Sequence, residues 1–289
     1  MREFAAMSAV RMPASFSVPA VDIVRDLHGD PCGADLVLFF NGNQWMVIEE
    51  LLAAFREAHP QVRRIYYETL PPGVLAEQIR CGALQMGTLS ITAAPDVFTA
   101  GREEMEALRR DGFLAQPRPY ARNGLAILVP AGNPAAVRGL ADLARPGTRV
   151  AMPNPAREGV GRLVVEALRK AGGEEAVRAV MEDKVRRGET FLTRIHHRET
   201  IDLLLAGRMD AGPVWFSEAL HQRRSGAALE TVALAPGHDV IGRYFAARLR
   251  SAPHGEAADA FVDFLAGPEG ARIYAAHGFL AADDGGGDR

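Results

Sequence analysis

Apolar residues along this chain form two alternating patterns, continuous runs of strand length and segments with helical spacing. Leu36–Phe40 is an unbroken apolar run, which is typical of a strand buried on both faces of a parallel sheet. In Trp45–His59 the apolar residues recur at helical spacing, and Pro60 ends the segment. The first part of the chain therefore predicts a strand followed by an amphipathic helix.

The same alternation continues almost to the end of the chain. Further strands are predicted over Val62–Glu68, Pro95–Thr99, Leu125–Val129, Arg149–Met152, Thr190–Arg194, Asp210–Trp215, Thr231–Leu234 and Arg243–Leu249. Helices are predicted over Val74–Cys81, Arg102–Arg110, Leu140–Ala144, Gly159–Ala171, Glu199–Leu205, Ser217–Arg224, Ala257–Leu265 and Pro268–His277. Strands that alternate with helices predict an α/β fold with parallel sheets and right-handed crossovers.

Two successive sets of strands and helices, followed by a C-terminal return, predict two Rossmann-like lobes joined by a hinge. We expect residues 36–125 and 238–283 to form the first lobe and residues 126–237 the second. Residues 1–35 are expected to be a lead-in segment, and residues 284–289 a flexible tail. Small ligands bind in clefts between lobes and beyond the carboxyl ends of strands, so the interlobe cleft is the expected site.

Composition and charge narrow the possible functions. The net charge of −3 gives no basic footprint for nucleic acid, and no apolar run is long enough to span a bilayer. The N-terminal segment shows no evident signal peptide, since Arg11 and Pro13 interrupt its apolar run. Cys32 and Cys81 either form one disulfide in an oxidising compartment or remain unpaired thiols.

Sequence motifs of common enzymes are not found. The chain has no Gly-x-Ser-x-Gly, Walker loop, His-Glu-x-x-His or Cys-x-x-Cys, and no complete dinucleotide fingerprint. An acid–base pair of Glu68 and His196 across the cleft is the remaining enzymatic alternative. The expected class is a binding protein without a cofactor, not an enzyme.

Two loops of the first lobe carry candidate ligand-binding residues. The first loop follows a strand and begins a helix, where backbone N–H groups bind anions and amides add directional hydrogen bonds; its candidates are Asn41, Gly42, Asn43 and Gln44. The same residues could simply cap the helix. In the second loop Thr69 offers a hydroxyl, whereas Glu68 in the cleft would repel an anion and attract a cation.

The second lobe supplies the other candidates. Asn154 follows a strand, and Arg157 could bind an oxyanion or a carboxylate through its guanidinium, although an exposed arginine is the alternative. One of His196 and His197 could donate to an anion or bind a metal, and Glu68 with these two histidines forms the alternative metal site. Trp215 ends a strand that faces the cleft, where its indole N–H could find a ligand.

Several blocks of the sequence resemble the type II periplasmic substrate-binding proteins of ABC importers, most closely their molybdate-binding branch. The blocks are Pro95–Ala100, Met105–Leu108, Gly112–Leu114, Asn123–Val129, Asp210–Ala219 and Phe264–Tyr274 with Gly278-Phe279. The resemblance extends from about residue 36 to residue 280, and it places His196-His197 in the fourth ligand loop.

The resemblance implies an extracytoplasmic protein, periplasmic or at the cell surface, that closes its lobes around a small ligand. The expected ligand is a molybdate-like oxyanion or a small organic acid, and the alternative is a metal ion or metal chelate. The expected partner is an ABC permease in the membrane, or alternatively a membrane sensor kinase, with no nucleic acid. We expect the protein to be a monomer.

Overall fold

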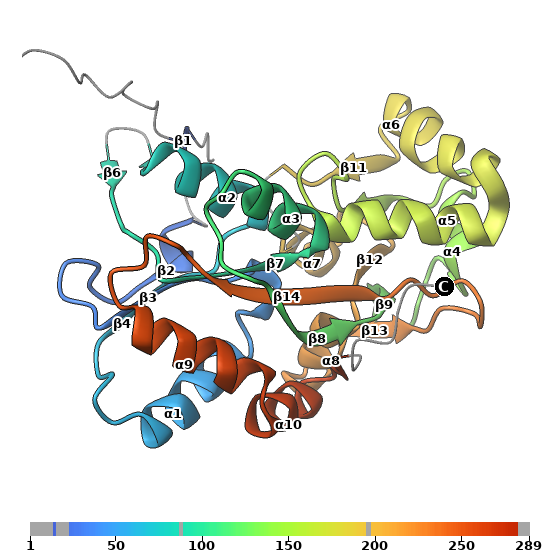
Figure 1. The fold of residues 1–289 in the computed structure, drawn as a ribbon. Helices are drawn as coiled ribbons and strands as arrows, with labels where there is room; N and C mark the ends of the chain where they lie inside the picture. The colour runs from blue at the N-terminus through green and yellow to red at the C-terminus, as the bar shows by residue number, and fades with distance from the viewer. Residues whose placement is uncertain (1–13, 16–22, 87–88, 195–197, 283–289) are drawn as a thin grey trace, which may run out of the picture.

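The computed structural model describes residues 14–15, 23–86, 89–194 and 198–282, which form two α/β lobes (Figure 1). Lobe 1 is built on a seven-stranded sheet, and lobe 2 on the sheets that contain β9–β13. The predicted two-lobed α/β fold is thus confirmed. Among the described residues, no helix has the length and apolar character needed to cross a membrane.

The sheet of lobe 1 has the strand order β15-β8-β14-β7-β3-β4-β2. Its strands are β2 (Leu27–His28), β3 (Leu36–Phe39), β4 (Ile65–Glu68), β7 (Val97–Gly101), β8 (Arg118–Asn123), β14 (Gly242–Arg248) and β15 (Leu280–Ala281). The neighbours of β3 are parallel to it, but β14 runs antiparallel to β7 and β8. The predicted parallel arrangement is found for β4, β3 and β7. Strand β14 is antiparallel because the chain leaves lobe 1 through β8 and returns through β14, in the opposite direction.

Helices cover both faces of this sheet, since its central strands are buried on both sides. Figure 1 shows α1 (Ile48–Ala58), α9 (Gly255–Ala266) and α10 (Pro268–Ala276) on one face, with α2 (Pro72–Cys81) and α3 (Arg102–Arg110) on the other. The apolar stripe of α1, with Leu51 and Phe55, packs in one core cluster, whereas Leu75 and Leu108 of α2 and α3 pack in another. A small three-stranded sheet adjoins α2 and contains β1 (Ala14–Ser15), β5 (Leu84–Met86) and β6 (Leu89–Ile91).

Lobe 2 contains an antiparallel sheet, β12-β9-β13, and a parallel pair, β10-β11. The strands are β9 (Leu125–Pro130), β10 (Val150–Met152), β11 (Thr190–Leu192), β12 (Gly212–Trp215) and β13 (Leu229–Val232). The helices are α4 (Leu140–Leu143), α5 (Gly159–Arg178), α6 (Lys184–Arg186), α7 (Arg198–Leu205) and α8 (Phe216–Arg224), with a π-helix over Ala179–Asp183. The long α5 passes through a kink at Gly172 and Gly173, whose backbone is non-helical.

Two segments connect the lobes. The first passes from β8 to β9 through Gly124, whose carbonyl accepts a hydrogen bond from the Phe216 N–H at the start of α8. The second leads from β13 back to β14. The lobe boundaries predicted from the sequence remain a proposal.

Cys32 and Cys81 are not joined by a disulfide, and the Cys81 thiol donates to Glu77 at 3.1 Å.

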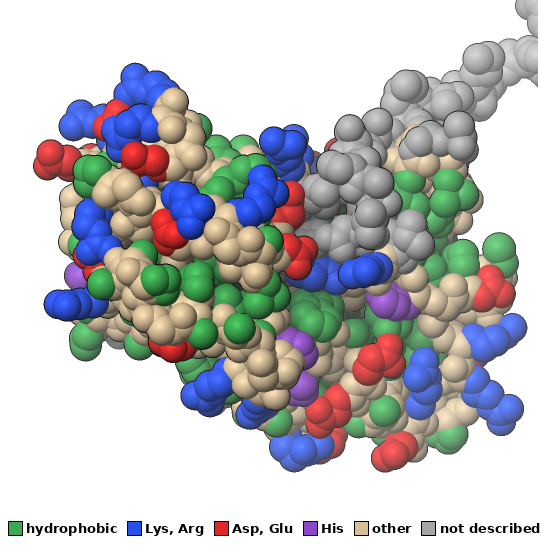
Figure 2. Space-filling model, turned by 180° about the vertical axis from the view of Figure 1, so that it is seen from behind, with side chains coloured by type: hydrophobic (Ala, Val, Ile, Leu, Met, Phe, Trp, Pro, Cys, Tyr) green, Lys and Arg blue, Asp and Glu red, His purple; other side chains and the backbone are tan. Residues whose placement is uncertain are grey.

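Charge on the surface is mixed. On the face in Figure 2, basic and acidic side chains lie interspersed among polar and apolar ones.

Candidate functional site

A cavity of about 350 Å³ lies between the lobes, at the ends of several strands. Segments from both lobes and both connections line it: residues 41–43, 71–72, 101–104, 158–160 and 162–163, Trp215, and residues 241–244. This is the position expected for a ligand site in a two-lobed α/β protein.

The turn after β3 forms one wall in lobe 1. The Asn41 N–H donates to Thr99 Oγ1 at 2.8 Å, which ties the turn to the neighbouring strand β7. Gly42 packs against the Thr69 carbonyl, and a Cβ at this position would lie 2.6 Å from that oxygen. Only glycine therefore permits this close approach between the two loops of lobe 1.

Asn43 is a buried amide on the same wall. Its Nδ2 donates to the Tyr244 hydroxyl at 2.6 Å, while its Oδ1 has no hydrogen-bond partner among the described residues. Since Tyr244 lies on β14, this bond fixes the first loop relative to the strand that returns from lobe 2.

Three helices begin at the cavity. Pro71 and Pro72 lie at the start of α2, Gly101 precedes α3, and Glu158 precedes α5. The first N–H groups of a helix have no partners within the helix, and the helix dipole places partial positive charge there. Two helices of lobe 1 and one of lobe 2 thus direct positive ends at one space, which suits an anion.

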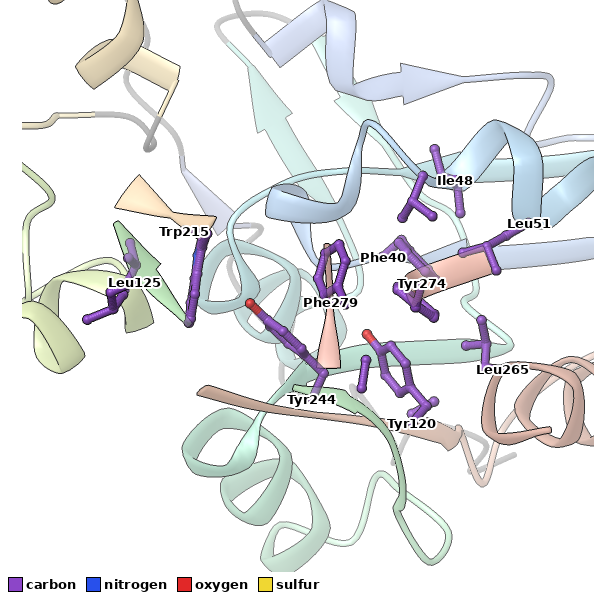
Figure 3. Close-up of a cluster of buried hydrophobic side chains, with 14 of the residues drawn as sticks. Phe40, Ile48, Leu51, Tyr120, Leu125, Trp215, Tyr244, Leu265, Tyr274 and Phe279 are labelled. Carbon is purple, nitrogen blue, oxygen red and sulfur yellow. The ribbon is translucent and has the colours of Figure 1, made fainter. Parts of the chain in front are cut away.

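Aromatic and aliphatic side chains form the wall near the connections. The rings of Trp215 and Tyr244 lie 5.6 Å apart between centroids at an angle of 57°, and both side chains are drawn in Figure 3. Gly242 packs directly beneath Trp215, because a Cβ there would lie 2.4 Å from the indole ring. Val160 and Leu163 of α5 extend this apolar surface.

Charged residues of both signs line the remaining wall, namely Arg102, Arg162, Arg243, Glu103, Glu104 and Glu158. Arg162 of lobe 2 forms ion pairs with Glu103 at 2.8 Å and Glu104 at 2.6 Å, both on α3 of lobe 1. These ion pairs connect the lobes across the cavity.

The structure brings four of the sequence candidates onto the wall: Asn41, Gly42, Asn43 and Trp215. Gln44 lies behind the wall, in the core. Its Nε2 donates to the Tyr120 hydroxyl at 2.7 Å, and its Oε1 accepts from Tyr274 at 2.6 Å. Both polar ends of this amide are therefore engaged by tyrosines of lobe 1.

Glu68 and Thr69 also lie away from the cavity. Glu68 is fully buried and accepts hydrogen bonds from Tyr66 at 2.8 Å and Gln78 at 3.0 Å. Burial raises the pKa of Glu68 to about 7, although the two hydrogen bonds oppose this shift. The Thr69 hydroxyl donates to the buried Asp26 at 2.8 Å, so it binds the segment before β3 and does not face the cavity.

The candidates of lobe 2 divide similarly. Asn154 Oδ1 accepts the Ala156 N–H at 3.0 Å, as a turn-forming residue does, and Arg157 is exposed and donates to the Arg194 carbonyl. Neither residue lines the cavity, because the Asn154 side chain turns toward its own loop and the Arg157 side chain toward the loop after β11. His196 and His197 lie outside the described residues.

Sequence reasoning missed several residues of the wall, above all Arg102, Arg162, Arg243 and Tyr244. Arg102 and Arg162 lie in the first turns of helices that were predicted, and that position was the available signal. In the described ranges, no group of three or more histidine, cysteine or acidic residues is placed to hold a metal ion.

Comparison with known proteins places this geometry among binding proteins. The sequence profile of the bacterial extracellular solute-binding proteins matches residues 36–280. The molybdate-binding protein ModA of Mycobacterium tuberculosis is 26% identical over 211 residues, which cover 72% of this chain and 74% of the relative.

Two solved structures illustrate the shared fold. The periplasmic molybdate-binding protein of Azotobacter vinelandii superposes with a TM-score of 0.70 at 18% identity, covering 86% of this chain and all of the other. The sulfate-binding protein SubI of Mycobacterium tuberculosis gives 0.67 at 21% identity, covering 86% and 87%.

Proposed function

The chain belongs to the bacterial extracellular solute-binding proteins, and from that premise we propose that it captures a small anionic ligand between its lobes for an ABC permease. The family description places its members outside the cytoplasm and makes them binding proteins, as the sequence predicted. A periplasmic or cell-surface position and delivery to a permease are parts of the proposal.

The observation that carries the proposal is the convergence of three helix N-termini on one interlobe cavity. The N-termini of α3 and α5 offer backbone N–H groups to this space, and the N-terminus of α2, whose lining residues Pro71 and Pro72 have no N–H, adds partial positive charge. Arg102 and Arg243 add guanidinium groups to the wall, and guanidinium forms strong charge-assisted hydrogen bonds with oxyanions. An anion in this position would contact both lobes at once.

Relatives that bind oxyanions support the anionic class. The relatives and solved structures named above include binding proteins for molybdate and for sulfate. We transfer to this chain only the chemistry that these ligands share, a compact oxyanion held by N–H donors.

Capture would proceed by closure of the lobes. A ligand that touches α3 on lobe 1 and α5 on lobe 2 gains more contacts when the lobes approach, so it favours the closed form by that difference in affinity. The permease would then recognise the closed pair of lobes.

A binding screen tests the proposal. Molybdate, sulfate, phosphate and small organic acids would be titrated by calorimetry and by thermal unfolding. A true ligand at 100 times its Kd should raise the free energy of unfolding by about 2.7 kcal/mol. Arg102→Gln and Arg243→Gln should each weaken binding about tenfold, or about 1.4 kcal/mol.

Arg178→Gln is the matched control, because Arg178 is exposed at the far end of α5 and should not affect binding. If no anion binds, or if all three variants behave alike, the proposed site is wrong.

A further inference from the structure

We propose that the ligand is an organic anion whose carbon skeleton lies against Trp215, Tyr244 and Leu163, with its anionic group at the helix N-termini. This inference rests on the proposed function and narrows it. It assigns ligand selection to the apolar wall near the connections, and it distinguishes this site from one built for a bare tetrahedral oxyanion.

The first argument is the size of the cavity. If each of its four oxygens is given the share of liquid volume of one water molecule, about 30 Å³, a tetrahedral oxyanion fills roughly 120 Å³. That is about a third of the 350 Å³ available between the lobes. A ligand that fills the site therefore needs several further atoms beyond its anionic group.

The lobes already touch each other around this space, so the volume does not come from separated lobes. Arg162 pairs with Glu103 and Glu104 across the cavity. Elsewhere along the interface, Arg198 of α7 pairs with the buried Asp26 and lies over the Trp45 ring of lobe 1.

The second argument is the chemistry of the apolar part of the wall. Trp215 and Tyr244 present an aromatic corner, and Leu163 and Val160 continue it along α5. A bare oxyanion gains no hydrophobic free energy from contact with such a surface. A carbon skeleton gains roughly 25 cal/mol of binding free energy per Å² of apolar area removed from water. The apolar wall is therefore complementary to an organic body.

Matched anion pairs test the inference directly. Phosphate would be compared with phenylphosphonate, and sulfate with benzenesulfonate, by isothermal titration calorimetry at one pH and ionic strength, with molybdate as a fifth probe. We expect each aryl anion to bind at least tenfold more tightly than its inorganic parent. Tighter binding of molybdate, sulfate or phosphate than of both aryl anions would overturn the inference and leave the proposed function intact.

Two variants locate the effect on the apolar wall. Leu163→Trp fills the space that the ring would occupy, so it should weaken the binding of phenylphosphonate at least tenfold more than that of phosphate. Trp215→Ala removes one face of the corner and should abolish the preference for the aryl anions. Thermal unfolding without ligand verifies that each variant folds.

An equal loss for phosphate and phenylphosphonate in the folded Leu163→Trp variant would show that the apolar wall does not select the ligand. Failure of all five anions to bind the wild-type protein would overturn the proposed function, and this inference with it.

Discussion

Glu68 is a carboxyl that the fold holds away from water. Burial raises its pKa from 4.5 to about 7, so the folded protein binds this proton at a higher pH than the unfolded chain. The resulting stability is fully present below about pH 4.5 and is lost as the pH rises through 7.

We predict that Glu68→Gln flattens this dependence. The amide stays neutral and can still accept from Tyr66 and Gln78, so the variant should be more stable than the wild type above pH 7, by on the order of 2 kcal/mol. Urea unfolding between pH 5 and pH 8 measures the difference. Glu57→Gln, at an exposed carboxyl on α1, should run parallel to the wild type. Parallel curves for Glu68→Gln would show that this carboxyl does not titrate with folding.

Lys184 is a buried ammonium in lobe 2. Its Nζ donates to the carbonyls of Leu143 at 2.8 Å, Arg145 at 2.8 Å and Thr148 at 2.5 Å, and these lie in and after α4. Burial lowers its pKa to about 8. Three carbonyl dipoles thus stabilise the charge. The three hydrogen bonds join the segment before β10 to α6, which follows the kinked helix α5.

We predict that Lys184→Met destabilises the protein by about 3–5 kcal/mol, since three buried carbonyls lose their donor at once. Denaturant unfolding monitored by circular dichroism measures the loss. Lys170→Met should cost less than about 1 kcal/mol, because Lys170 is exposed on α5, where it pairs with Glu166 and donates to the Asp239 carbonyl, both at 3.4 Å. Similar effects of the two substitutions would assign no special role to the buried ammonium.

At the scale of elements, strong apolar periodicity made most helices and strands predictable. The helix Arg102–Arg110 has the same bounds in the sequence prediction and in the structure. The helix predicted over Trp45–His59 begins later, at Ile48, because Gly42–Gln44 forms a separate 3₁₀ turn. Strand β8 was missed because its sequence, Arg-Pro-Tyr-Ala-Arg-Asn, carries charges that lie at the sheet surface while Tyr120 and Ala121 are buried.

The sequence predicted only those parts of the candidate site that lie in loops directly after strands. The turn Asn41–Asn43 was found because it follows a fully apolar strand. Thr69 occupies an equivalent position after β4, yet its hydroxyl turns toward Asp26, a contact 43 residues away in sequence. The direction of a loop side chain depends on such long-range partners, which periodicity does not reveal. The same reason explains why the arginines of α3 and α5 were missed.

The start of α5 is held by a close contact that sets the position of the cavity wall. A Cβ on Gly161 would lie 2.5 Å from the Pro153 carbonyl and 2.7 Å from the Pro155 nitrogen, both backbone atoms. We predict that Gly161→Ala displaces this end of the helix, lowering stability by about 1–3 kcal/mol and weakening ligand binding.

Thermal unfolding and calorimetry with the best anion measure the two effects of Gly161→Ala. Gly139→Ala is the matched control, because a Cβ there meets no atom within 4 Å and the backbone is extended. Unchanged stability in Gly161→Ala would mean that the loop before α5 yields without cost.

At the scale of the whole molecule, the ion pairs of Arg162 make the closure of the two lobes depend on charges that each lobe carries. Arg162 is a third exposed, Glu104 is mostly buried and Glu103 is mostly exposed. Solvent screening limits such pairs to about 0.5–1 kcal/mol in total. That is enough to shift a balanced equilibrium between open and closed lobes severalfold.

We predict that Arg162→Gln opens the ligand-free protein, increasing its radius of gyration in small-angle X-ray scattering, and that high salt opens the wild type in the same direction. Arg272→Gln, which breaks an ion pair with Glu269 inside α10, should leave the radius unchanged.

Because Arg162 also lines the cavity, binding alone cannot separate closure from ligand contact. Arg162→Glu combined with Glu104→Arg and Glu103→Gln should restore the compact form without restoring anion affinity. The charge between the lobes is then re-paired with no carboxylate left to repel it, while the guanidinium moves from α5 to α3. If the exchanged protein remains as open as Arg162→Gln, the ion pair does not hold the lobes together, and closure must depend on the ligand and on packing near the connections.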